Sequence, residues 1–173
     1  MIRAYGADSI RAAEAPLLAA GVPLMRQAAR AIATATVGEI RDRGQRVPGS
    51  VVLALVGGGN NGGDALWAAA DLARRGVAAH AALCARTVHA EGLAAARSAG
   101  VRIVRVVPED GGEPDIAALL DVARHSGAWI DGLAGIGLSG PLREPLARIV
   151  AALEEERLAS PDEPVVIAVD VPS

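Results

Sequence analysis

The beginning of the chain places apolar residues three and four positions apart, whereas the rest alternates between such stretches and short continuous apolar runs. Intervals of three and four keep apolar side chains on one face of a helix. They predict two amphipathic helices at residues 7–19 and 23–43. We therefore expect a helical N-terminal part covering residues 1–45.

The remaining part, residues 50–173, contains five runs rich in β-branched residues with helix-like stretches between them. The predicted strands are 51–56, 77–83, 101–107, 128–133 and 165–170, and the predicted helices are 62–75, 89–99, 115–125 and 144–157. Strands this apolar must be covered on both faces. The pattern predicts an α/β protein, a three-layer α/β/α sandwich with a mostly parallel sheet, in which residues 1–173 form a single domain.

Composition narrows the classes of partner. All 17 basic residues are arginine, the formal net charge is -3, and the only aromatic residues are Tyr5, Trp67 and Trp129. This charge does not attract nucleic acid, and so few aromatic side chains offer no platform for stacking bases. We expect no nucleic-acid partner.

The cellular setting follows from the one cysteine and the start of the chain. Cys84 cannot form an internal disulfide and is expected to be a small buried apolar residue. The first residues carry charges where a signal peptide has its apolar stretch, and no window of eighteen residues is continuously apolar. These features favour a cytoplasmic protein without membrane contact.

The segment GGGNNGGDA, residues 57–65, lies between the first predicted strand and the helix after it. Gly57, Gly59 and Gly62 satisfy the GxGxxG pattern of a dinucleotide-binding turn, but the acid expected after the second strand is missing, and the next one is Glu91. A P-loop needs a lysine, which the chain lacks. Two interpretations stay open: an anion site at a helix N-terminus, and a turn that is merely tight.

Two further strand ends carry glycines or acids. DGLAGIGLSGPLREP, residues 131–145, begins with Asp131, and VVIAVDVPS, residues 165–173, contains Asp170 and Ser173. The carboxyl ends of parallel strands lie at one edge of a sheet, where α/β proteins bind ligands. The three segments together predict a pocket at that edge.

GNNGGDA, DGLAGIGLSGPLREP and AVDVPS resemble, in order and spacing, the characteristic segments of the YjeF N-terminal domain family, the NAD(P)H-hydrate epimerases. AAGVPLMRQAA is similar to the opening of the family. The resemblance implies a Rossmann-like fold and interconversion of the R and S forms of hydrated NADH and NADPH beside a bound potassium ion. It also implies a fused or separate dehydratase that uses ADP or ATP.

Domains of this family continue for several tens of residues beyond the last segment. The chain is therefore expected to be C-terminally truncated, lacking its last strands. We expect it to fold, to be weakly active or inactive, and to expose a sheet edge through which a homodimer forms.

The resemblance also implies the site residues. Those expected to bind substrate are Asn60, Asn61, Gly62, Gly63, Asp64, Gly135, Ile136, Gly137, Leu138, Ser139, Gly140, Pro141 and Asp170. The potassium ligands are expected to be Asn61, Asp131 and Ser173, whose oxygen atoms suit a hard cation. Asp170 is the first choice for the catalytic acid and base, and Asp64 is the second.

Some residues depart from the family pattern or have simpler explanations. Ala65 and Ala70 stand where the family often has glycine and arginine, and RQAA at 26–29 replaces Glu-Asn-Ala-Gly. The three histidines lack ligand spacing, so they are interpreted as core or solvated residues, and Trp67 as a packing residue. The alternative function is a non-catalytic dinucleotide-binding or scaffold module of the same fold.

Overall fold

The computed structural model describes residues 6–135, 142–170 and 173. Its sheet has five strands, β1 (Val51–Val56), β2 (Ala78–Leu83), β3 (Arg102–Arg105), β4 (Ala128–Gly132) and β5 (Val165–Ala168). Their order is β3-β2-β1-β4-β5, and every neighbouring pair is parallel. The predicted parallel α/β fold is confirmed.

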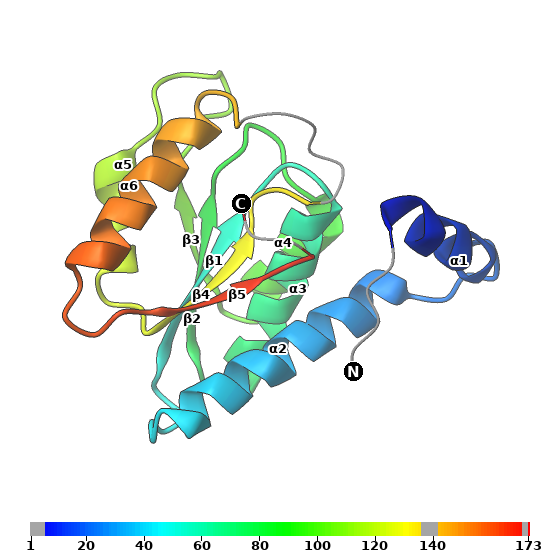
Figure 1. Ribbon diagram of the computed structural model, residues 1–173, viewed down its shortest axis with the longest axis horizontal. Helices are drawn as coiled ribbons and strands as arrows, with labels where there is room; N and C mark the ends of the chain where they lie inside the picture. The colour runs from blue at the N-terminus through cyan, green and yellow to red at the C-terminus, as the bar shows by residue number, and fades with distance from the viewer. Residues whose placement is uncertain (1–5, 136–141, 171–172) are drawn as a thin grey trace.

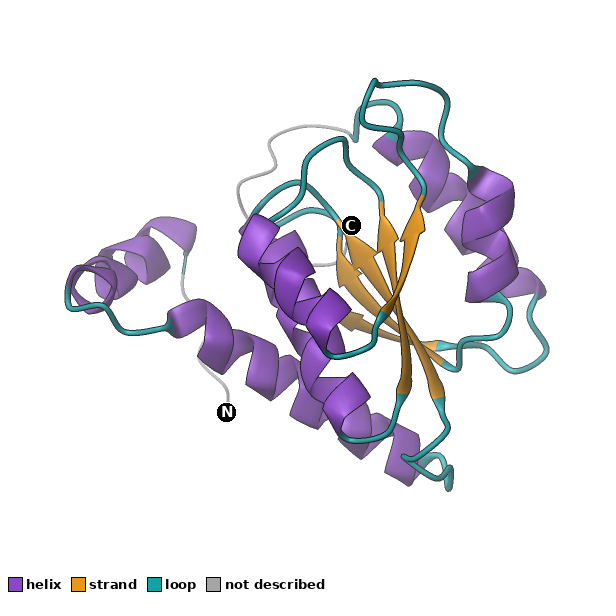
Figure 2. Ribbon diagram, turned by 180° about the vertical axis from the view of Figure 1, so that it is seen from behind, coloured by secondary structure: helices purple, strands orange, loops and turns teal. Residues whose placement is uncertain are grey.

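Six helices accompany these strands in the described residues. They are α1 (Ala7–Ala19), α2 (Leu24–Asp42), α3 (Asn60–Arg74), α4 (Ala90–Ser98), α5 (Ile116–Ala123) and α6 (Leu146–Ala159). Helices α2, α3 and α4 cover one face of the sheet, and α5 and α6 cover the other (Figures 1 and 2). Both faces are therefore enclosed, as the apolar strands require.

Strand β1 supplies side chains to both halves of the core. Val52, Ala54 and Val56 pack with the α2–α4 layer, whereas Leu53 and Leu55 pack with the α5–α6 layer. Successive side chains of a strand point to opposite faces, so a central strand between two helical layers must be apolar at every position. This explains why the run at residues 51–56 is continuous rather than alternating.

The two N-terminal helices differ in their surroundings. α2 buries Ala29, Ala33, Val37 and Ile40 in the core. α1 stands away from the sheet in both views (Figures 1 and 2), and each of its side chains that the structure describes is exposed. The helical part predicted for residues 1–45 thus contains one helix of the core layer and one outside it.

Several boundaries at the carboxyl edge of the sheet differ from those predicted by one or two residues. β3 ends at Arg105 because the next two amides, of Val106 and Val107, both donate to the Leu83 carbonyl, which turns the chain. β5 ends at Ala168, so Asp170 lies in the turn after the strand. α3 begins two residues earlier than predicted, at Asn60.

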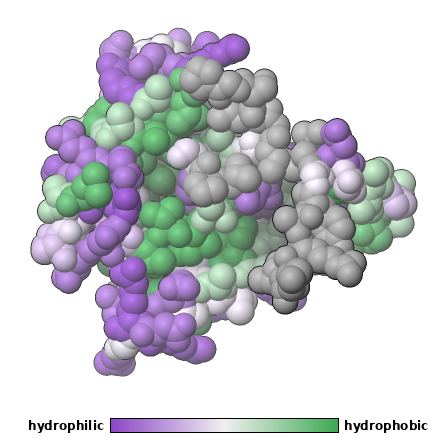
Figure 3. Space-filling view, in the orientation of Figure 1, coloured by the Kyte–Doolittle hydropathy of each residue, from purple (hydrophilic) through white to green (hydrophobic). Residues whose placement is uncertain are grey.

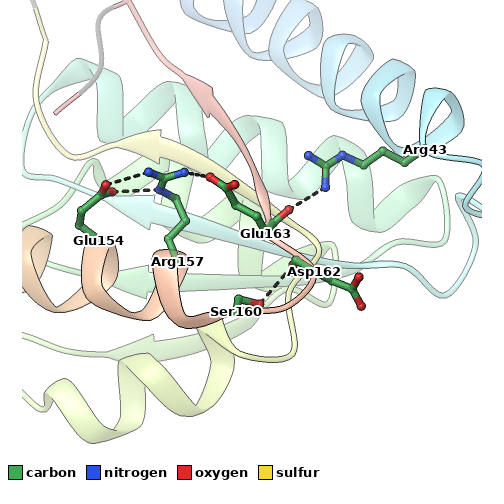
Figure 4. A network of polar contacts seen from close by, with 6 residues as sticks. All are labelled: Arg43, Glu154, Arg157, Ser160, Asp162 and Glu163. Atoms are coloured by element: carbon green, nitrogen blue, oxygen red, sulfur yellow. Dashed lines mark hydrogen bonds and ion pairs between the residues drawn. The ribbon is translucent and has the colours of Figure 1, made fainter.

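A polar network joins α2, α6 and the segment before β5 (Figure 4). Arg157 forms ion pairs with Glu154 and Glu163, and Arg43 donates to the Glu163 carbonyl at 2.8 Å. These contacts are at the surface, where an ion pair contributes less than about 1 kcal/mol. They orient the chain entering β5 more than they stabilise the fold.

Beside β5, an apolar cavity of about 250 Å³ opens between the sheet and α6. Trp129, Leu133 and Val150 line it together with the partly exposed Val166, and Figure 3 shows apolar surface between α6 and β5. In the described residues β5 is one of the two edge strands of the sheet, and β3 is the other. No helix in the described part of the chain is long and apolar enough to cross a membrane.

Candidate functional site

The glycines after β1 are required by backbone packing at two positions. A Cβ atom on Gly62 would lie 2.1 Å from the Gly57 carbonyl oxygen, and one on Gly57 would lie 2.1 Å from the Leu133 carbonyl oxygen. For Gly59, in contrast, no atom of the described residues lies within 4 Å of that position. Gly62 therefore packs the start of α3 on the turn after β1, and Gly57 packs that turn on the end of β4.

Helix α3 begins at this turn, so the predicted substrate loop Asn60–Asp64 is a helical turn. Gly59 is the N-cap in an extended conformation, and it supplies no side-chain cap. The first amides of such a helix are available to a ligand, and the helix dipole makes this end electropositive. The site thus presents the positive end of α3 at the carboxyl edge of the sheet.

The Asn61 side chain connects the three segments that the sequence analysis identified at the strand ends. Its Nδ2 donates to the Ala134 carbonyl at 3.0 Å and to the Val169 carbonyl at 2.9 Å. Gly135 lies directly against it, because a Cβ there would be 2.5 Å from Nδ2. One amide side chain therefore connects the turn after β1 with the ends of β4 and β5.

Asp131 is a buried carboxylate within β4. Its Oδ1 accepts from the Leu133 amide at 3.2 Å, and its Oδ2 accepts from the Ser173 amide at 2.8 Å. The Ser173 hydroxyl in turn accepts from the Ala134 amide at 3.1 Å. These bonds to backbone amides compensate the cost of burying the carboxylate and bring Ser173 to the end of β4.

Asp64 lies in α3 and is half-buried, and its Oδ1 is buried without a hydrogen-bond partner in the described part of the chain. Burial disfavours its charged form, and the negative charges of Asp170 and Glu14 add to that effect. Together they raise the pKa of the Asp64 carboxyl to about 7. A carboxyl with this pKa can donate and accept protons at neutral pH.

Asp170 lies in the turn after β5 and differs in conformation and exposure. Its φ is 67°, in the left-handed region that non-glycine residues seldom adopt, and its side chain is exposed. Strained backbone of this kind is concentrated at functional sites. The negative charge of Asp170 contributes to the raised pKa of Asp64.

The structure therefore brings most of the predicted site residues together. Asn61, Gly62, Gly63, Asp64, Asp131, Gly135, Asp170 and Ser173 meet at the carboxyl edge of the sheet, with the exposed Asn60 beside them. Ile136, Gly137, Leu138, Ser139, Gly140 and Pro141 lie outside the described residues.

Sequence reasoning missed the role of His89. Its Nδ1 accepts from the Gly92 amide at 3.1 Å and caps α4, and its ring lies 3.0 Å from the Cβ position of Gly63. The signal was its place as the first residue of the helix predicted at 89–99, where a polar side chain can serve as a cap. Trp67 packs as expected, beneath the Arg26 guanidinium at 3.9 Å.

The predicted potassium ligands supply an amide, a carboxylate and a hydroxyl. Asn61 donates to the Ala134 carbonyl, and the Ser173 hydroxyl accepts from the Ala134 amide. The Ser173 amide also donates to Asp131. These hard oxygen donors suit a group I or II cation. Among the described residues, no three His, Cys, Asp or Glu side chains gather as a metal site.

Comparison with known proteins gives relatives over nearly the whole chain. NAD(P)H-hydrate epimerase of Microbacterium testaceum is 46% identical over 172 residues, which are 99% of this chain and 60% of that protein. NAD(P)H-hydrate epimerase of Clavibacter michiganensis subsp. michiganensis is 47% identical over 171 residues, 98% of this chain and 69% of that protein. The chain thus spans less than two thirds of the first relative.

A longer relative and a solved structure add to this. Bifunctional NAD(P)H-hydrate repair enzyme Nnr of Mycobacterium tuberculosis is 43% identical over 173 residues, 98% of this chain and 32% of that protein. The crystal structure of the yeast protein ynu0, YNL200c, matches with a TM-score of 0.78 at 20% identity, covering 99% of this chain and 71% of that one. That likeness supports the fold.

Residues 21–173 also match the family described as YjeF-related protein N-terminus. The match includes the helix α2, the glycine turn and both acidic strand ends. The chain belongs to the YjeF-related protein N-terminus family.

Proposed function

We propose that this chain is an NAD(P)H-hydrate epimerase, which interconverts the R and S forms of hydrated NADH and NADPH. The observation that carries the proposal is the pair of Asp64 and Asp170 at the carboxyl edge of the sheet, where the half-buried member has a pKa of about 7. The relatives named as epimerases support the same reaction.

The chemistry requires a proton donor and a stabilised cation. The hydrate carries a hydroxyl on a ring carbon bonded to nitrogen, so cleavage of the C–O bond releases water and leaves a cation that the nitrogen stabilises. Addition of water to the opposite face restores the hydroxyl with inverted configuration. The first step needs a proton on the leaving oxygen, and the second returns a proton to a base.

The two aspartates divide this work. Asp64, which holds its proton near neutral pH, protonates the departing hydroxyl. The exposed carboxylate of Asp170 stabilises the ring cation and takes a proton from the incoming water, and exchange with solvent resets both groups. The amides at the start of α3 bind the pyrophosphate, because that end of the helix attracts anions.

Asn61, Asp131 and Ser173 would hold a potassium ion beside this pair. When bound, the ion supplies positive charge that helps to fix the substrate next to the buried carboxylate. A crystal soaked with rubidium or thallium gives the test. An anomalous peak at these three side chains is expected, and a featureless map there in a well-ordered crystal contradicts the assignment.

A dehydratase, fused or separate, is the partner that we propose, since the Mycobacterium tuberculosis relative is named as bifunctional. Removal of the hydrate by a second enzyme makes epimerisation useful, because only one epimer then needs to be its substrate. Association with a second copy through the exposed edge at β5 stays a prediction.

The decisive experiment is incubation of the chain with the separated R hydrate, with the S form followed by chromatography. We expect the S form to appear faster than without protein, and the rate to fall about 100-fold or more in Asp64→Asn. Binding of a nicotinamide dinucleotide without any acceleration would identify a non-catalytic binding module instead.

A further inference from the structure

The order of the strands fixes the direction in which a dinucleotide would lie across the site. Asp131 lies near the carboxyl end of β4 and Asp170 follows β5, which places the reacting ring on that side of the sheet. The sheet order then continues through β1 to β2. Neighbouring strands lie about 4.8 Å apart, so β5 and β2 are separated by roughly 14 Å, which only an elongated ligand bridges.

The loop after β2, residues 84–89, directly adjoins the glycine turn. A Cβ on Gly58 would lie 3.2 Å from the Thr87 carbonyl oxygen, and the ring of His89 lies against Gly63. The two loops therefore form one continuous edge along which the second half of the dinucleotide can extend. In dinucleotide-binding folds the adenosine ribose lies at the end of this second strand.

This loop lacks the group that recognises an unphosphorylated ribose. An acid there would accept a hydrogen bond from the ribose 2′-hydroxyl of NAD, whereas an arginine accommodates the 2′-phosphate of NADP. Residues 84–89 read CARTVH, with Arg86 three residues after the strand and no Asp or Glu. The chemistry of the loop therefore favours a phosphate.

Arg86 is held in position by the loop after β3. Its Nε donates to the Glu109 carbonyl at 3.3 Å, and its guanidinium lies 3.3 Å from the Cβ position of Gly111, which has a φ of 83°. A side chain at Gly111 would therefore crowd the guanidinium. Arg86 also lines a cavity of about 380 Å³ formed by the loops after β2 and β3 and the start of α6.

The acids around this cavity are engaged by other arginines. Glu113 and Glu144 pair with Arg148, and Glu109 pairs with Arg105 at 3.0 Å. Within residues 6–135, 142–170 and 173, Arg86 forms no ion pair. Its two terminal nitrogens can bind a phosphate bidentately.

We propose that Arg86 determines substrate specificity by binding the 2′-phosphate of the adenosine ribose, so that the site prefers hydrated NADPH to hydrated NADH. This preference rests on the proposed function, because it assigns the far end of the same substrate. Loss of a charge-assisted hydrogen bond costs about 1.5–3 kcal/mol, which corresponds to a loss of about 10- to 150-fold in affinity.

Calorimetric binding of NADP⁺ and NAD⁺ to the whole chain tests the proposal without requiring turnover. The wild type is expected to bind NADP⁺ at least about 10-fold more tightly, and Arg86→Gln to lose that preference while its affinity for NAD⁺ stays the same. Arg86→Lys should keep part of the preference, because it retains the charge but not the planar fork. Arg97→Gln, an exposed arginine in α4, is the control and should change neither affinity.

Equal affinities of the wild type for NADP⁺ and NAD⁺, or an equal loss of both in Arg86→Gln, would overturn the proposal. The epimerisation assay separates this failure from failure of the proposed function. If the chain prefers NADP⁺ but converts neither hydrate, the role of Arg86 is supported and the epimerase function is not. If the chain converts both hydrates with equal kcat/KM, the epimerase function is supported and the role of Arg86 is contradicted.

Discussion

The turn after β1 and the turn after β5 each bring an aspartate to the same edge of the sheet, but different forces hold them. Gly62 packs on the Gly57 backbone, and Asp64 follows inside a helix, half-buried. The turn after β5 is held by polar bonds, from Asn61 to the Val169 carbonyl and from the Ser173 amide to Asp131. Asp170 lies in that turn, exposed and left-handed.

This difference in surroundings gives two identical side chains different acid–base properties. Burial favours the protonated form of Asp64, whose Oδ1 has no hydrogen-bond partner among the described residues, whereas the side chain of Asp170 is exposed to water. Pairs of titratable groups in unlike surroundings are typical of acid and base assignments in enzymes. The comparison can be tested one turn at a time.

The largest effect is expected from Gly62→Ala. The new methyl group would lie 2.1 Å from the Gly57 carbonyl oxygen, a contact with backbone that only a shift of α3 relieves. We expect a loss of more than about 4 kcal/mol in the free energy of unfolding, measured by urea denaturation. Gly59→Ala is the matched control, since none of the atoms that the structure describes lies within 4 Å of the new methyl group, and it should cost less than about 1 kcal/mol.

The second largest loss of stability is expected from Asp131→Ala, which removes bonds that hold the turn after β5. This change leaves the amides of Leu133 and Ser173 without their acceptor, at a cost of about 3 kcal/mol by the same denaturation measurement. Asp131→Asn keeps one acceptor oxygen and should cost about half as much. A stable Asp131→Ala variant would show that water replaces both bonds.

Asp64→Asn should stabilise the protein, and only at higher pH. The folded pKa of about 7 lies above the ordinary value of 3.8, so the unfolded chain loses this proton first. Stability therefore falls as the pH rises from about 4 to 7, and Asn removes that loss. We expect a gain of about 2 kcal/mol at pH 8, reduced by solvent screening, and none near pH 4. The same gain at both pH values would exclude an effect of protonation.

The smallest effect on stability is expected at Asp170. Glycine adopts a φ of 67° without steric cost, so Asp170→Gly should stabilise the fold by less than about 1 kcal/mol, whereas Asp170→Ala should cost about as much. Thermal unfolding compares the two variants. Both should lose epimerase activity, which would separate the chemical role of the carboxylate from its effect on the turn.

The parallel sheet and both helical layers could be predicted from the sequence, because the spacing of apolar residues indicates each strand and helix. The meeting of three strand ends could be predicted as well, because parallel strands place their carboxyl ends at one edge of the sheet. The sequence did not reveal that Gly57 and Gly62 pack on backbone, since their close neighbours include Leu133, far along the chain. The order in which the sequence placed Asp170 before Asp64 as the catalytic group stays a prediction. The environment of Asp64 depends on Glu14 and Asp170, which lie distant in sequence and approach it only in the fold.

The most direct measurement is a titration of the Asp64 carboxyl by carbon-13 NMR, without potassium, in the wild type and in Asp170→Asn. The wild-type midpoint should lie near 7, and removal of the neighbouring charge should lower it. A wild-type midpoint near the ordinary value of 3.8, or one that Asp170→Asn leaves unchanged, would contradict the division of work between the two aspartates.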